Sequence, residues 1–164
     1  MDGVKRIFLC LTAVFCLAGA LCACRKTEDT PDLPTALARV QEALGGEETF
    51  IAADDDFVAT NFGEPAHLSQ SRVCFDAGGA AREIGLFLLD DPAEAAGFEK
   101  KIRAYLETEA EALASLAALY PAGELENRLA LYKNAAVGSR GALVYYFVLD
   151  HNDAQKALAA LAEK

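Results

Sequence analysis

The sequence predicts an α+β domain: a small antiparallel sheet of about four strands, built from two strand–strand–helix units, with helices packed on it. Three observations favour this class. Short segments typical of strands come in two pairs, each separated by a turn signal. Each pair is followed by apolar residues at helical spacing. One or two further helical patterns precede the first pair. Such units favour helices gathered on one face of the sheet.

The first predicted helix covers residues 33–44. Its apolar residues recur on one helical face: Leu33, Leu37, Val40 and Leu44. Pro34 suits the first turn, and Gly45-Gly46 ends the helix. The aspartates at 54–56 come before Phe57, Val58 and Phe62, which predicts a second short helix or turn with an acidic cap.

The first strand pair lies between residues 72 and 89. Residues 72–76 alternate polar and apolar, residues 77–80 (AGGA) form a hairpin-like break, and residues 83–89 (EIGLFLL) are apolar on both faces, as in a central strand. Asp90-Asp91-Pro92 then starts the longest helix, which ends near Pro121. Its apolar stripe contains Phe98, Ile102, Leu106, Ala110, Leu113 and Ala117, with Tyr105 and Leu116 at the edge.

The second strand pair repeats this order. Residues 135–138 predict a strand, residues 139–141 a turn, and residues 142–149 (ALVYYFVL) a second strand. A cap at residues 150–153 begins the last helix. Both central strands are apolar on both faces, so the face away from the paired helices also needs a cover. We expect the helix at 33–44 to provide it; the alternative is a partner or ligand on an open binding face.

The N-terminus has the pattern of a lipoprotein signal. Lys5 and Arg6 precede an uncharged run at 7–23. Leu21-Cys22-Ala23-Cys24 resembles the bacterial lipobox, with an aliphatic residue at −3, a small one at −1 and the cysteine that receives the lipid. We therefore expect residues 1–23 to be a signal peptide, residues 24–32 to be the lipidated Cys24 with a flexible tether, and residues 33–164 to be one domain. An uncleaved membrane anchor and a secreted soluble form are the alternatives.

The charge excludes some partners. Loss of residues 1–23 removes two of 15 basic and one of 25 acidic residues, which changes the net charge from −10 to −11. Such a chain is not expected to bind nucleic acid, because that binding depends on neutralising phosphates. Contact with the membrane is expected through acyl chains on Cys24, each contributing about 0.8 kcal/mol per buried CH₂. The expected location is the extracytoplasmic face of the cell membrane.

No catalytic constellation is visible. Cys74 is the one cysteine beyond the leader and its junction, and His67 and His151 are the two histidines. Cys74 lies within an alternating strand, which predicts a structural role. The serines (Ser69, Ser71, Ser115 and Ser139) lack the G-x-S-x-G pattern of a nucleophile elbow. We expect no enzyme and no cofactor. The alternative is an envelope hydrolase or thiol enzyme that uses Cys74 with a histidine.

The acidic clusters have two interpretations. The clusters at 54–56 (DDD), 90–91 (DD) and 150–153 (DHND) offer oxygen ligands to calcium, but none has EF-hand spacing. Their positions before helices predict capping instead. A calcium-dependent module remains a third alternative. A sugar site would have no tryptophan to stack on the sugar ring, because the chain contains none. Four tyrosines could take that role: Tyr120, Tyr132, Tyr145 and Tyr146.

Several local features carry a resemblance to a known family. A helix ends in Phe62-Gly63, where that family tends to have Tyr-Gly, and a strand starts at Glu83-Ile84. Residues 134–137 lead through a turn into the strand at 144–149, with Gly141-Ala142 where the family tends to have Gly-Asn-Tyr. In these features the chain resembles bacterial lipoproteins, mostly of clostridia and their gut relatives, that carry the domain of unknown function 4358.

The resemblance covers roughly residues 35–163. It implies a lipoprotein and the same order of helices and strands, and it implies no reaction. Together with the residue patterns, it predicts a non-enzymatic, membrane-anchored module of the cell envelope. Its expected partner is a small ligand or an envelope protein.

Overall fold

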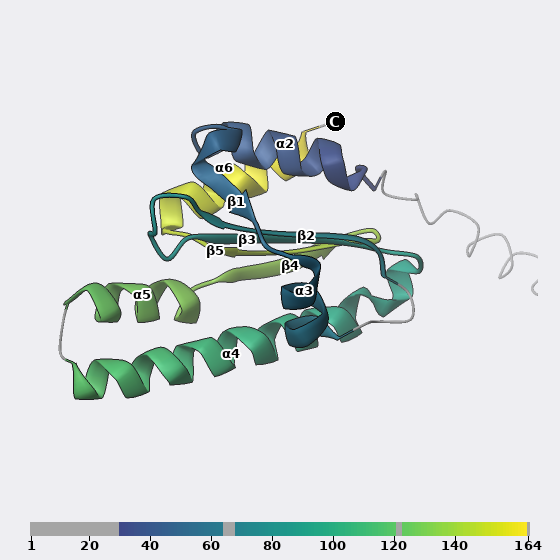
Figure 1. Cartoon of the computed structure of the whole chain (residues 1–164). Coiled ribbons are helices and arrows are strands. Elements are labelled where there is room, and N and C mark those ends of the chain that lie inside the picture. Colours follow the sequence, from purple (N-terminus) through teal and green to yellow (C-terminus); the bar gives the residue numbers. More distant parts are fainter. Residues whose placement is uncertain (1–29, 64–67, 121–122, 164) are drawn as a thin grey trace, which may run out of the picture.

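A five-stranded antiparallel sheet forms the centre of the computed structural model, which describes residues 30–63, 68–120 and 123–163 (Figure 1). The strand order is β1-β2-β3-β5-β4. The strands are β1 (Phe50–Ala52), β2 (Leu68–Asp76), β3 (Glu83–Leu89), β4 (Ala136–Arg140) and β5 (Leu143–Val148). The predicted α+β class is confirmed. The strand beyond the expected four is β1, three residues that extend the sheet edge beside β2.

Five α-helices pack on this sheet within the described residues. They are α2 (Leu33–Ala43), α3 (Asp55–Phe62), α4 (Ala95–Leu119), α5 (Gly123–Lys133) and α6 (His151–Ala162). Short 3₁₀ turns at Glu47–Thr49 and Pro92–Glu94 precede β1 and α4. Four of the helices follow the sequence pattern. The exception is α5, which the pattern did not predict and in which no residue is fully buried.

The helices divide between the two faces of the sheet (Figure 1). α2 and α6 cover one face, where Val40 and Ala157 pack with Leu86 and Phe147. α3, α4 and α5 lie on the other face. The expectation that the helices gather on one face is therefore wrong. β3 and β5 are apolar on both sides and so need cover on both; the structure places α4, after the first strand pair, on one face and α6, after the second, on the other. The expected cover by the helix at 33–44 is confirmed, and α6 shares that role.

The α4 face has an aromatic core. Phe62, the last residue of α3, inserts its ring among Phe87, Tyr105 and Tyr146, at centroid distances of 4.9, 5.0 and 5.9 Å. These rings meet edge-on or tilted, which suits their quadrupoles. The predicted helix end at Phe62-Gly63 thus anchors α3 to the sheet.

Aspartates cap three of the α-helices (α2, α3 and α6) and the 3₁₀ turn that precedes α4. Side-chain oxygens accept backbone N–H groups in four pairs: Asp32 from Thr35 (3.0 Å), Asp54 from Phe57 (2.8 Å), Asp91 from Ala93 (2.8 Å) and Asp150 from Asp153 (3.0 Å). Each bond satisfies a donor that a helix start leaves free. The last three pairs account for the aspartate clusters singled out in the sequence.

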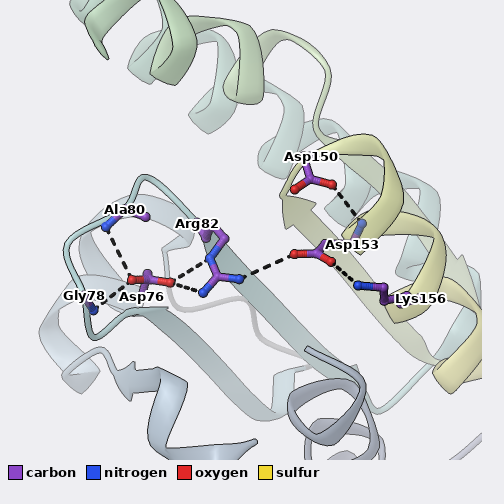
Figure 2. A network of polar contacts seen from close by, with 7 residues as sticks. All are labelled: Asp76, Gly78, Ala80, Arg82, Asp150, Asp153 and Lys156. Carbon is purple, nitrogen blue, oxygen red and sulfur yellow. Dashed lines mark hydrogen bonds and ion pairs between the residues drawn. The ribbon is translucent and has the colours of Figure 1, made fainter. Parts of the chain in front are cut away.

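A polar network joins the β2–β3 turn to α6 (Figure 2). Asp76 accepts the Gly78 and Ala80 N–H groups at 2.8 and 3.4 Å and pairs with Arg82. Arg82 also reaches Asp153 at 3.5 Å, and Asp153 pairs with Lys156 at 2.7 Å. Burial raises the pKa of Asp76, but hydrogen bonds and charge from Arg82 outweigh it and leave the pKa below its usual range.

Two strand boundaries differ from those predicted from the sequence. β2 begins four residues earlier than expected, at Leu68. β4 continues through Arg140, so the turn predicted at 139–141 consists of Gly141 and Ala142. Gly141 has φ +59°, and glycine is favoured at the first position of such a two-residue hairpin loop.

Candidate functional site

A buried carboxyl group lies at the centre of the α4 face. Glu83, the first residue of β3, is 1% exposed. Three tyrosine hydroxyls donate to it. Tyr105 lies 3.0 Å from Oε1, Tyr132 lies 2.9 Å from Oε2, and Tyr146 donates to Oε1. These four residues, the Glu83 cluster, join β3, α4, α5 and β5.

Gly85 makes room for one of the three tyrosines. It lies opposite Tyr146 in the β3–β5 pair. A Cβ at Gly85 would lie 2.0 Å from the Cε1 atom of Tyr146. The Tyr146 ring therefore lies against the backbone of β3 at Gly85, and its hydroxyl reaches the carboxyl group of Glu83, two residues before Gly85. The glycine inside an otherwise apolar strand is explained by this close approach.

Burial decides the electrostatics of the cluster. It raises the pKa of Glu83, and the three tyrosine hydrogen bonds only partly oppose that effect. Burial and the neighbouring Glu83 carboxylate also raise the pKa of Tyr105, Tyr132 and Tyr146. The tyrosines therefore keep their protons at neutral pH and act as donors. Among the described residues, no cation forms an ion pair with Glu83.

A hollow of about 500 Å³ lies beside this cluster, between α4, α5 and β4. We call it the α4–α5 hollow. Its apolar wall consists of Leu106, Ala110, Ala114, Ala135 and Val137. Its charged residues are Arg103, Glu107, Glu111 and Lys133. Tyr132 completes the lining, so one residue both borders the hollow and donates to Glu83.

Two further hollows flank these elements. One of about 310 Å³ lies between α3 and α4 and includes Tyr105 and Asn61. The other, about 400 Å³, lies between α5 and α6 and includes Asn134 and His151. The Glu83 cluster contributes to the first through Tyr105 and contributes nothing to the second.

Cys74 is a core residue. It is 2% exposed and packs in the cluster on the α2/α6 face. Burial raises the pKa of its thiol, whereas a nucleophilic cysteine needs a lowered pKa and access to substrate. His151 is exposed at the start of α6. His67 and the lipobox residues (Leu21, Cys22, Ala23 and Cys24) lie outside the described residues.

The candidate serines take local roles. Ser69 donates to Asp90, Ser115 to the Glu111 carbonyl at 2.9 Å, and Ser139 to Glu99 at 2.9 Å. Ser71 is half-buried in β2. Within the described ranges, no three His, Cys, Asp or Glu side chains gather where they could hold a metal ion. No helix there combines the length and apolarity needed to cross a membrane.

The tyrosines considered for sugar stacking have diverse environments. Tyr146 is fully buried, and Tyr132 is half-buried with its hydroxyl on Glu83. Tyr145 packs on the opposite face from Tyr146, as the alternation of a strand predicts. Tyr120, at the end of α4, is 67% exposed.

Sequence reasoning missed the Glu83 cluster. One signal was present: Glu83 is the single charged residue in EIGLFLL, a strand that is otherwise apolar. A carboxyl group at the start of such a strand needs partners if the strand is central. The tyrosines that provide them follow 22, 49 and 63 residues later, so no local pattern connects them.

Comparison with known proteins adds no relative. No family model matches the chain, and no curated protein or solved structure is significantly similar to it. The resemblance to the clostridial lipoproteins therefore stays a prediction.

Proposed function

We propose that this protein is a non-enzymatic binding module of a bacterial cell envelope, attached to the extracytoplasmic face of the membrane through lipid on Cys24. In this proposal a small ligand occupies the α4–α5 hollow. The lipobox pattern, the polar tether and the resemblance to clostridial lipoproteins support the location. The strong negative charge fits attachment by lipid rather than by basic residues.

One observation carries the binding proposal: a residue in the wall of the hollow is fixed from behind by a buried carboxyl group. Tyr132 borders the hollow and donates to Glu83 at 2.9 Å. A buried carboxyl group is costly, and an apolar residue of similar volume often gives equal or greater stability. Its presence favours a role in orientation, because it sets the position of Tyr132 and, through it, of α5.

The dimensions and lining of the hollow also fit a ligand. Its volume, about 500 Å³, lies within the range of small-molecule sites, about 300–1,000 Å³. Small alanines leave the space, and charged groups border it. An apolar wall with a few polar groups is the usual composition of a ligand site.

A hollow-filling variant tests the site. The full chain, purified in detergent, is melted with a panel of amino acids, peptides, sugars and peptidoglycan fragments. A ligand at a hundredfold excess over its Kd stabilises the fold by about 2.7 kcal/mol. Ala114→Trp fills the hollow and should abolish the shift. Ala112→Trp, at an exposed position outside the lining, should keep it. An unchanged shift in Ala114→Trp would refute the site.

The anchor has its own test. Cells that express the chain are labelled with radioactive palmitate and fractionated. The wild-type protein should carry label and sediment with membranes. Cys24→Ala should lose the label and should no longer mature to the shorter lipidated form. Cys22→Ala should still carry the label and should still mature to that form. Label that persists in Cys24→Ala would contradict lipidation at this residue.

A further inference from the structure

The C-terminal end of α4 exposes apolar side chains. Among the described residues, four large apolar side chains are exposed, and three of them lie there: Leu116 (46%), Leu119 (73%) and Tyr120 (67%). Residues 112–123 also contain no charged side chain, in a chain with a net charge of −10. Single exposed apolar residues are ordinary, but a cluster without charges has the composition of an interface core.

These exposed residues continue a row that starts inside the fold. Five positions recur at intervals of 4, 3, 4 and 3 residues: Tyr105, Glu109, Ala112, Leu116 and Leu119. We call them the α4 seam. Their mean spacing is about 3.5 residues, which keeps side chains on the face of one helix that packs along a second helix. Tyr105 and Glu109 line the hollow of about 310 Å³ between α3 and α4, whereas the three outer positions are exposed. α3 therefore meets only the inner end of the seam.

Glu109 places one charge on the seam. Its side chain is half-buried, and among the described residues it forms no ion pair within 4.0 Å. Lys101 also lines the hollow between α3 and α4, but it precedes Glu109 by eight residues, a rise of about 12 Å along the helix. A half-buried carboxylate in a row of apolar residues favours a cation on the opposing helix, because charge at a helix interface selects the partner.

This charge disfavours a second copy of the chain on the seam. In a parallel pair the two Glu109 carboxylates would meet. In an antiparallel pair centred on Ala112, each Glu109 would face a leucine, because the seam itself carries no cation. Each copy would also bring a net charge of −10. A partner that supplies a basic residue satisfies Glu109, and the apolar positions beyond it then pack on the outer seam.

The exposed part of the seam lies far from the start of the described chain. Thr30 accepts the N–H of Ala142 in the β4–β5 turn at 3.3 Å, and Leu89, which precedes α4, donates to the carbonyl of Ala142. From that end of the sheet, α4 runs about 36 Å to Leu119, at about 1.5 Å per residue (Figure 1). With the proposed lipid on Cys24, the outer seam is therefore at the end of the protein away from the tether.

From these features we propose that the α4 seam docks an amphipathic helix of another protein, whose apolar side chains pack on Leu116 and Leu119 and whose lysine or arginine pairs with Glu109. The small side chain of Ala112 lets the two helices approach closely at the middle of the seam. The inference goes beyond the ligand of the α4–α5 hollow, because the seam shares no residue with the lining of that hollow.

Designed helical peptides test the seam. Each is about 21 residues long, rich in alanine and glutamine, and long enough to form a helix. It repeats the seam spacing with leucines, and one lysine replaces the second or the fourth leucine, because the partner helix can run parallel or antiparallel to α4. Matched peptides carry glutamine in place of that lysine. Binding to the full chain in detergent is measured by fluorescence anisotropy, with protein-free micelles as the blank. In one orientation, the lysine form should bind roughly two- to fivefold more tightly than the glutamine form.

Single substitutions locate the contact on the protein. Leu116→Ser should weaken binding of the lysine peptide about tenfold or more, because a leucine is lost from an apolar contact. Ile51→Ser, the same kind of change at an exposed residue of β1, should leave binding unchanged. Glu109→Gln should abolish the preference for lysine over glutamine. Glu111→Gln, at an exposed position of α4 outside the seam, should keep that preference. Thermal melting checks that each variant folds.

Several results would overturn the proposal. They are a lack of binding by every peptide, equal binding of the lysine and glutamine forms, and equal losses in Leu116→Ser and Ile51→Ser. Sedimentation of the full chain as a dimer that Leu116→Ser dissociates would assign the seam to a second copy instead. Membrane association of Cys24→Ala that a further Leu116→Ser abolishes would assign the seam to the lipid surface.

Discussion

The two faces of the sheet are built on different principles. On the α2/α6 face, the residues of β3 and β5 meet helices through aliphatic and aromatic contacts, with Leu86 and Phe147 fully buried. On the α4 face, the same two strands contribute Glu83 and Tyr146 to a buried polar cluster next to a hollow. The first face supplies stability, and the second combines stability with orientation. Substitutions should therefore act differently on the two faces.

The largest expected effect is on the apolar face. Leu86→Ala should lower the free energy of unfolding by about 2–5 kcal/mol, because it leaves a cavity in a packed core. The loss should not change between pH 5 and pH 8, since burial raises the pKa of Cys74, the thiol in that cluster, and keeps it protonated over this range. Urea unfolding at pH 5 and pH 8 measures both properties. A loss below about 1 kcal/mol would indicate that α2 and α6 pack loosely there.

The next effect concerns the close approach at Gly85. Gly85→Ala should lower stability by about 1–3 kcal/mol, because its Cβ would overlap the Tyr146 ring. The tyrosine near-ultraviolet circular dichroism should change with it, as the ring is displaced from Glu83. Gly97→Ala is the matched control: it lies on exposed α4 surface, where a Cβ meets nothing within 4 Å. An unchanged spectrum in Gly85→Ala would refute the proposed ring position.

Glu83 should make stability depend on pH. Its pKa is raised in the folded state above the ordinary value of 4.5, so the folded protein binds the proton more tightly than the unfolded chain. This contribution is fully present below pH 4.5 and is lost as pH rises through the folded pKa. Glu83→Gln removes the titration and keeps the size of the side chain.

The unfolding free energy of Glu83→Gln should therefore be compared with that of the wild type over a range of pH. Its deficit in unfolding free energy should be largest near pH 4 and should shrink or reverse toward pH 8. Urea unfolding of both proteins at each pH measures this difference. The pH-dependent contributions of other carboxyl groups, such as Asp76, are the same in both proteins and therefore cancel. A deficit that grows toward pH 8 would mean that the folded state prefers the ionised carboxylate.

The smallest effect should be local. Tyr132→Phe removes one hydrogen bond, a net loss of about 1 kcal/mol, and frees α5 from Glu83. Hydrogen exchange in α5 should accelerate, while exchange in α6 should not change. Tyr145→Phe, on the other face, is the control. Equal acceleration in both helices would show that α5 is not held separately by this bond.

Much of the fold could be predicted because its signals are local. The α2 and α4 stripes, the aspartate caps and the strand pair at 72–89 each involve residues within a few turns or across a short loop. The three residues of β1 are too few to form a pattern. α5 has no fully buried side chain, so it lacks a clear apolar face that would predict it.

The division of the helices and the site needed tertiary information. The apolar character of residues 83–89 on both faces required cover on both sides, but it did not say which helix takes which side. The α4–α5 hollow depends on α5, which the pattern did not predict. Glu83 was visible only as the start of a strand, because its partners come from three distant elements.

Hydrogen exchange of the full chain, with and without a saturating amount of a panel compound that raises its melting temperature, tests most directly whether the α4 face is the binding face. The account predicts added protection in residues 103–114 and 131–137, which contain the lining of the hollow. It predicts no added protection in α2 or α6. Protection of α2 or α6, or no added protection at the hollow, would contradict the account.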